Sequence, residues 1–108
     1  MGHRFQWAAV IAAAVAVSGC ATDLGEAGAR VMIVGPDEVA GYEYLGPVAG
    51  SSMQAGVMAV QGFHNALNEM LDEAGAKGAT HVVLTFNPGP VYWTWHQRVR
   101  GDAYKARP

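Results

Sequence analysis

The side chains best suited to metal chemistry in this sequence are three histidines, His64, His81 and His96. His81 and His96 fall on two predicted strands that flank a turn at residues 87–90. Pairing of these strands about the turn would place both imidazoles on one face, where a Glu or Asp could complete a site for Zn²⁺ or Cu²⁺. The sequence contains no HExxH, no Cys-x-x-Cys and no local cluster of three ligands. A metal- or small-ligand-binding site at His81 and His96 is therefore only an alternative, and we expect no metal and no cofactor.

Groups that could catalyse a reaction lack their usual partners. Ser51 and Ser52 have no recognisable base or oxyanion partner, and the carboxylates of Asp72 and Glu73 fall on the polar face of a predicted helix. No nucleophile elbow, phosphate loop or dinucleotide fingerprint occurs in the sequence. We therefore expect a protein that is not an enzyme.

The remaining candidates for function are three aromatic residues that lie close together in the sequence, Tyr92, Trp93 and Trp95. Residues 91–99 alternate in character, which predicts a strand with Trp93 and Trp95 on one side. One interpretation places both tryptophans in the core beneath the helix. The other is an exposed aromatic strand that binds a protein partner, because Trp and Tyr are enriched in binding hot spots.

The elements that would position these residues follow in the order ββαββ. Strands are predicted at residues 30–34 and 41–48, where Pro47 indicates an edge or the end of a strand because it cannot donate to a ladder. Apolar positions from Val60 to Ala74 fall on one face of an amphipathic helix that stops at Gly75 or Gly78. A continuous apolar strand at residues 80–86, predicted to be central and covered on both faces, precedes the strand at 91–99. The expected fold is α+β, a small antiparallel sheet with one main amphipathic helix packed on it.

The N-terminus has the features of a secretory signal peptide. Residues 1–6 carry Arg4 as their only fixed charge, residues 7–17 are uninterruptedly apolar, and small residues follow at 18 and 19. This order of a positive start, a short apolar stretch and a small-residue exit is typical of a cleavable signal. The apolar run is shorter than the roughly 20 residues that a spanning helix needs.

The only cysteine, Cys20, follows this segment directly. Val17, Ser18, Gly19 and Cys20 resemble the bacterial lipobox, which implies cleavage before Cys20 and lipidation of its thiol. Residues 1–19 are then a signal peptide, 20–29 the lipidated cysteine and a flexible tether, and 30–108 a single periplasmic domain. By the same resemblance, Ala21 rather than Asp after the cysteine indicates the outer membrane, with the domain facing the periplasm.

The charge balance argues against a nucleic-acid partner. Without Arg4, six basic residues remain against nine acidic ones, a formal charge of −3. A nucleic-acid-binding domain usually carries a basic surface instead. We expect no nucleic acid, and a membrane contact made through the N-terminal lipid.

The mature sequence resembles a known family in three segments, at residues 42–48, 66–84 and 101–105. The strongest is the passage Gly78, Ala79, Thr80, His81, Val82, Val83, which leads from the helix into the next strand. These segments are similar to a family of small proteobacterial outer-membrane lipoproteins of unknown function, which is similar in turn to the Rcs envelope-stress sensor lipoprotein. Members of that family typically carry cysteines at the positions of Tyr42 and Ala106, and their joint absence implies the loss of one disulfide.

Together these features predict a lipid-anchored envelope protein that acts through contacts with an envelope protein partner, in sensing or in assembly. The alternatives are the metal- or ligand-binding lipoprotein described above and a purely structural envelope component.

Overall fold

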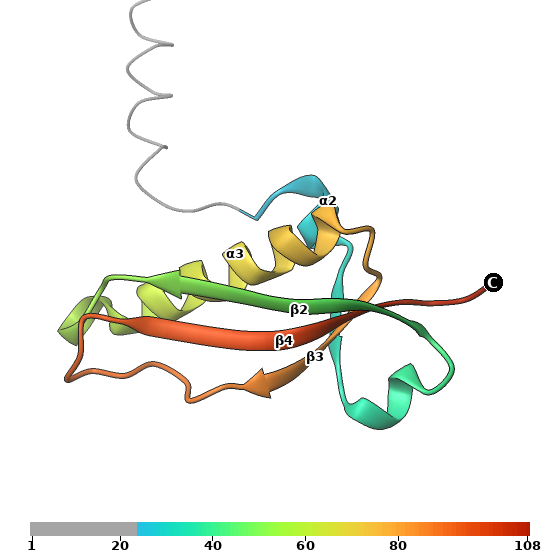
Figure 1. Ribbon diagram of the computed structural model, residues 1–108. Coiled ribbons are helices and arrows are strands. Elements are labelled where there is room, and N and C mark those ends of the chain that lie inside the picture. The colour runs from blue at the N-terminus through green and yellow to red at the C-terminus, as the bar shows by residue number, and fades with distance from the viewer. Residues whose placement is uncertain (1–23) are drawn as a thin grey trace, which may run out of the picture.

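The computed structural model describes residues 24–108, and Cys20 with the predicted signal peptide lies outside them. Two α-helices, four strands and two 3-10 turns follow along the described chain (Figure 1). In chain order they are α2 (Glu26–Ala29), β1 (Met32–Val34), η1 (Pro36–Val39), β2 (Glu43–Ser52), η2 (Gly56–Met58), α3 (Ala59–Ala76), β3 (His81–Phe86) and β4 (Gln97–Lys105).

The four strands form one sheet in the order β1-β3-β4-β2. β4 pairs antiparallel with both β2 and β3, whereas β1 runs parallel to β3. The predicted class, an α+β fold with one main helix on a small sheet, is confirmed. β2 and β3 run in the same direction because α3 returns the chain between them, and β1 pairs in parallel with the other side of β3.

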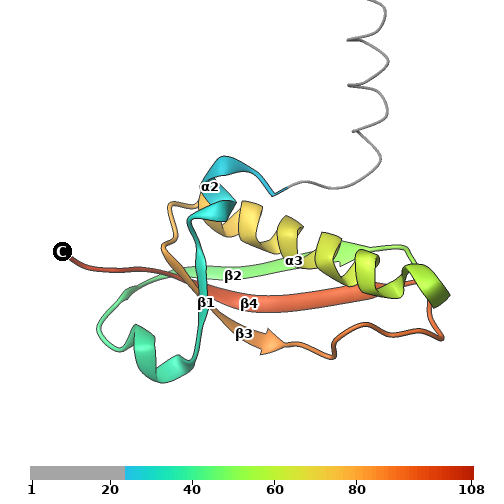
Figure 2. The same ribbon diagram turned by 180° about the vertical axis from the view of Figure 1, so that it is seen from behind.

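The predicted amphipathic helix is α3, and its apolar face lies over β2 and β4 (Figures 1 and 2). Gly50 of β2 sits directly beneath the helix, where a Cβ atom would overlap the carbonyl oxygen of Ala66. Gly78, which follows the helix, has a φ of +83°, a conformation that glycine adopts without strain. The largest fully buried side chains include Met70 of the helix and Val82 and Val99 of the sheet.

Strand β3 is covered on one face only, so the prediction that both faces are covered is wrong. Val82 is fully buried, but its neighbours His81 and Val83 on the other face are only half-buried, and Thr85 and Phe86 are exposed. The reason is that the main helix lies over β2 and β4, and the described chain provides no second helix for the opposite face. The position of Pro47 on an edge strand agrees with its prediction.

Part of the predicted tether belongs to the folded domain. Residues 26–29 form α2, which packs against α3 where Gly28 meets the backbone of Asp72 and Gly75 meets that of Ala27. The backbone N–H of Gly25 donates to the Asp72 carboxylate at 2.8 Å. Small residues that looked like a flexible linker instead allow this close approach between two helices.

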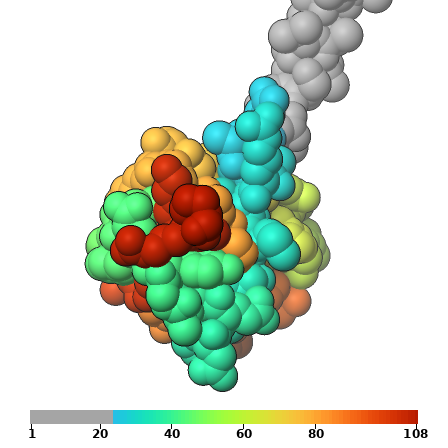
Figure 3. Space-filling view, turned by 90° about the vertical axis from the view of Figure 1, so that its right-hand side faces the viewer, coloured from blue at the N-terminus to red at the C-terminus, as the bar shows by residue number. Residues whose placement is uncertain are grey.

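The C-terminal residues lie at the end of the domain where α2 meets the helix C-terminus (Figure 3). The backbone N–H of Ala106 donates to the Thr80 hydroxyl at 2.8 Å, and Glu43 is paired with Lys105. In the part of the chain that is described, no helix combines the length and apolar character needed to cross a membrane.

Candidate functional site

Large apolar side chains project into solvent at the end of the domain where α3 begins. Two connections meet there, residues 53–58 between β2 and α3 and residues 87–96 between β3 and β4 (Figures 1 and 2). Val57 is 98% exposed, Trp93 87% and Trp95 70%. We name the following exposed residues the apolar end: Met53, Val57, Met58, Tyr92, Trp93 and Trp95.

The side chain of Gln97 ties the two connections together from beneath. It is fully buried, and its amide donates to the carbonyls of Gln54 and Val91, both at 2.7 Å. Its side-chain oxygen accepts the Val91 N–H at 2.8 Å. The N–H of Gly56 donates to the Tyr92 carbonyl at 3.2 Å. Partly buried backbone groups of both connections find partners in this way, so the exposed aromatics lie above a hydrogen-bonded base formed by Gln97, Gln54 and Val91.

The side chain of Gln54 extends this base to the helix. It accepts a hydrogen bond from the Asn65 amide at 3.0 Å and from the Ser52 hydroxyl at 3.3 Å. Gln61, one turn earlier on α3, donates to Asn65 at 3.0 Å. The loop before the helix is therefore anchored to its first turns.

The prediction for residues 91–99 is wrong in its first part, because β4 begins only at Gln97. Phe86 pairs with Arg100 rather than with Val91, so residues 87–96 form a long connection and not a tight hairpin. Trp93 and Trp95 are exposed in this loop, which contradicts their placement in the core. The structure agrees with the other interpretation in that both tryptophans are exposed, but they lie on a loop rather than a strand.

Sequence reasoning missed Met53, Val57 and Met58, and it also missed the role of Gln97. A usable signal was present in the charges. No Asp, Glu, Lys or Arg occurs at residues 44–68 or at 78–97. These two stretches contain both connections of the apolar end, together with most of β2, the first half of α3 and all of β3.

The two histidines proposed as metal ligands are not brought together. His81 pairs with Tyr104 near one end of β4, and its ring packs edge-on against Tyr42 at 5.0 Å. His96 precedes the other end of that strand, which at about 3.3 Å per residue is more than about 20 Å away. The predicted pairing is wrong because β3 and β4 are not joined by a tight turn at residues 87–90. Phe86 pairs with Arg100 and not with Val91. Among residues 24–108, no group of three His, Cys, Asp or Glu side chains could hold a metal ion.

The carboxylates that were considered for catalysis make structural contacts. Asp72 accepts the Gly25 N–H, and Glu73 accepts the Ala49 N–H at 3.3 Å. Ser52 donates to Gln54, as described above. Each of these groups contributes to packing of the helix or of β2 in the described domain.

The sheet face away from α3 carries a second aromatic group. The rings of Tyr44 and Tyr104 lie 5.4 Å apart, and the Tyr44 hydroxyl donates to Asp102 at 3.3 Å. Desolvation, and then the Asp102 carboxylate, raise the pKa of the Tyr44 hydroxyl above its ordinary value. This face is mixed in character, since Arg98 and Arg100 also extend from it.

No family model matches the chain, and the comparison with curated proteins found no match. The resemblance to small outer-membrane lipoproteins consequently stays a hypothesis.

Proposed function

We propose that this protein is a lipid-anchored component of the bacterial envelope that acts by binding another envelope protein through the apolar end. The observation that carries the proposal is the exposure of Trp93, Trp95 and Val57 on a hydrogen-bonded base. Large apolar side chains that gather at one end of a soluble domain and remain this exposed often mark a surface that meets a partner.

The chemistry of this surface specifies the partner. No charged side chain lies in the stretches that build the apolar end, so a complementary surface would itself be uncharged and apolar. Trp and Tyr provide a large contact area with few rotatable bonds, which keeps the entropy cost of binding low. The proposed partner is therefore an envelope protein with an exposed apolar groove or patch.

The lipid anchor is supported by the sequence at Cys20, which lies close to the folded domain along the chain. At about 3.5 Å per residue, the chain from Cys20 to Leu24 spans at most about 14 Å. A domain held by a lipid on Cys20 would then remain close to the bilayer, within reach of membrane-bound partners. Leu24 packs against the core, so little further length is left for a tether.

The family resemblance fits the observed pairing of strands. Glu43 pairs with Lys105 at the end of the antiparallel ladder, and Tyr42 and Ala106 are the residues next to this terminal pair in the sequence. These are the two positions at which the resembling lipoproteins carry cysteines. Residues that face each other across an antiparallel pair lie at a separation suited to a disulfide.

The proposal is tested by site-specific photocrosslinking in cells, with the crosslinker at residue 57 or, as a control, at exposed residue 35 on the opposite side of the domain. The captured protein is then purified, and its affinity is measured for wild type, for the double variant Trp93→Ala/Trp95→Ala and for Tyr44→Ala. Loss of two aromatic side chains that the complex would bury should weaken binding by about 100-fold or more. Tyr44→Ala removes an exposed aromatic of another face and should leave binding within about two-fold.

The proposal is wrong if residues 57 and 35 capture the same proteins, or if the double variant binds the captured protein as tightly as wild type. Crosslinking of residue 57 to lipid alone would also contradict it, because the apolar end would then contact the membrane rather than a protein.

A further inference from the structure

The outer edge of β2 leaves part of its backbone open. Lys77 Nζ donates to the Pro47 carbonyl at 3.0 Å, and the Ala49 N–H donates to Glu73, so both residues direct backbone groups away from β4. In an antiparallel pair such outward residues alternate with paired ones, so Ser51 also directs its N–H and C=O outward. Within the described chain, no hydrogen-bond partner meets these two groups or the Ala49 carbonyl.

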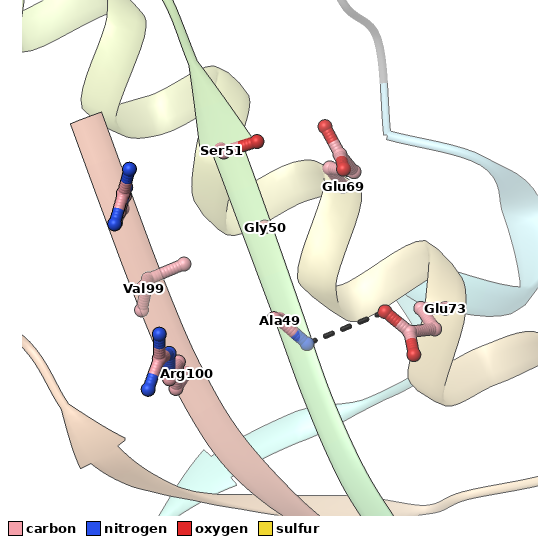
Figure 4. A pocket seen from close by; sticks show the side chains of 8 residues that line it. Ala49, Gly50, Ser51, Glu69, Glu73, Val99 and Arg100 are labelled. Atoms are coloured by element: carbon pink, nitrogen blue, oxygen red, sulfur yellow. Dashed lines mark hydrogen bonds between the residues drawn. The ribbon is translucent and has the colours of Figure 1, made fainter. Parts of the chain in front are cut away.

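A shallow pocket of about 410 Å³ lies along this open stretch. Small, exposed side chains at Ala49 and Ser51 leave the edge accessible (Figure 4). The residues of this pocket that matter for the argument, named here the β2 edge site, are Ala49, Ser51, Glu69, Glu73, Arg98 and Arg100.

Opposite charges flank the β2 edge site on the two faces of the sheet. Glu69 and Glu73 extend from α3 on one face, next to the outer side of β2 (Figure 4). Arg98 and Arg100 belong to the other face, because they alternate along β4 with Val99, which is buried beneath the helix. In the register of the sheet, Arg100 lies beside Ala49 and Arg98 beside Ser51.

We propose that the β2 edge site binds an extended segment of another protein, which adds to the sheet as a fifth strand and alternates basic and acidic side chains. Successive side chains of a strand point to opposite faces. The basic side chains would face Glu69 and Glu73, and the acidic ones would face Arg98 and Arg100. Backbone hydrogen bonds to the Ala49 carbonyl and to the N–H and C=O of Ser51 would supply affinity, and the charges would supply register and selectivity.

A second copy of this chain fits the β2 edge site poorly. Two-fold antiparallel pairing of β2 with itself would place the glutamates of both copies on one face and the arginines of both on the other. Like charges opposite each other destabilise strand pairing. The charge pattern therefore favours a different chain. The β2 edge site is separate from the apolar end, so this inference does not depend on the proposed function.

The test uses the full-length protein purified from membranes in a non-ionic detergent. Two labelled hexapeptides are compared by fluorescence anisotropy, one alternating Lys and Glu, the other with three Lys followed by three Glu. The alternating peptide should bind about ten-fold more tightly, since only it places like charges on one face. Added salt should reduce this preference.

Ser51→Pro removes the outward N–H and should weaken binding of the alternating peptide about ten-fold, whereas Ser51→Ala keeps that donor and should bind as wild type does. Pro47 already occupies an equivalent outward position, so the fold should accept the change. Glu69→Gln, at an exposed helix position, is the second variant and should weaken binding by about three-fold. Trp93→Ala/Trp95→Ala should leave peptide binding unchanged.

Equal affinity for the two peptides, or no binding of either, would overturn the proposal. Unchanged binding by both Ser51→Pro and Glu69→Gln would do the same. If the protein dimerises without any peptide and Ser51→Pro abolishes that dimer, the β2 edge site binds a second copy instead, and the proposal is wrong.

Discussion

Gln97 shows how one buried polar side chain decides the conformation of a functional loop. Its amide satisfies backbone groups on both connections of the apolar end, and it lies where the alternation of residues 91–99 would otherwise continue a strand. The hydrogen bonds to Val91 hold residues 91–96 away from a regular ladder. Tyr92, Trp93 and Trp95 are displayed in solvent as a result.

Gln97→Leu keeps the approximate volume of the side chain but leaves three partly buried backbone groups without their partner. We expect the free energy of unfolding to fall by at least about 2 kcal/mol, because unsatisfied buried groups are costly. Urea denaturation monitored by tryptophan fluorescence measures this change. Gln61→Leu is the matched control, since Gln61 is exposed, and its effect should stay within about 0.5 kcal/mol. Equal effects of the two substitutions would contradict the role given to Gln97.

At the scale of elements, contact between α3 and β2 depends on the absence of a side chain at Gly50. A Cβ atom there would overlap the Ala66 carbonyl oxygen, so any side chain must push the helix away. The buried face of α3 provides much of the core, including Phe63, Met70 and Leu71.

Gly50→Ala should therefore destabilise the domain by about 1–3 kcal/mol or more, as overpacking of a core does. Gly35→Ala is the control, because a Cβ atom at that position would meet no atom within 4 Å and the φ of Gly35 is −76°. That change should be neutral or stabilise by up to about 1 kcal/mol. Thermal unfolding of both variants provides the comparison, and a stable Gly50→Ala would show that the helix is not packed as described.

The elements that sequence could predict are those whose pattern is local. The helix at residues 59–76 follows from its apolar periodicity, and the edge position of β2 follows from Pro47. The parallel pairing of β1 with β3, the single covered face of β3 and the loop at residues 87–96 all depend on contacts distant in sequence. No pattern within residues 91–99 reveals that Gln97 bonds to Gln54.

Only the part of the candidate site that is local in sequence could be predicted. Tyr92, Trp93 and Trp95 could be identified as a possible contact surface from residue type alone. Met53, Val57 and Met58 could not, because they join that surface only when η2 meets the β3–β4 connection. The pairing of His81 with His96 failed for a related reason, since a local turn did not set the strand register.

The whole molecule is polarised from end to end. The two connections of the apolar end contain no Asp, Glu, Lys or Arg, whereas α2 and the C-terminal part of α3 carry Glu26, Asp72 and Glu73, with Lys77 directly after the helix. Gly25 contacts Asp72, and the thirteen positions back to Ala59 correspond to about 20 Å of helix. A chain anchored through Cys20 would thus enter the domain at its charged end and present the apolar end about one helix length away.

The most direct test of this account is the intact mass of the protein purified from bacterial membranes, compared with that of Cys20→Ala. Lipidation predicts a wild type that has lost residues 1–19, carries the mass of a diacylglycerol and acyl group on Cys20, and sediments with membranes. Cys20→Ala should lack that added mass and should no longer be recovered as a lipidated protein in the membrane fraction. An unmodified wild type, or one cleaved at another position, would contradict the anchor and with it the proposal that the apolar end meets its partner at the membrane.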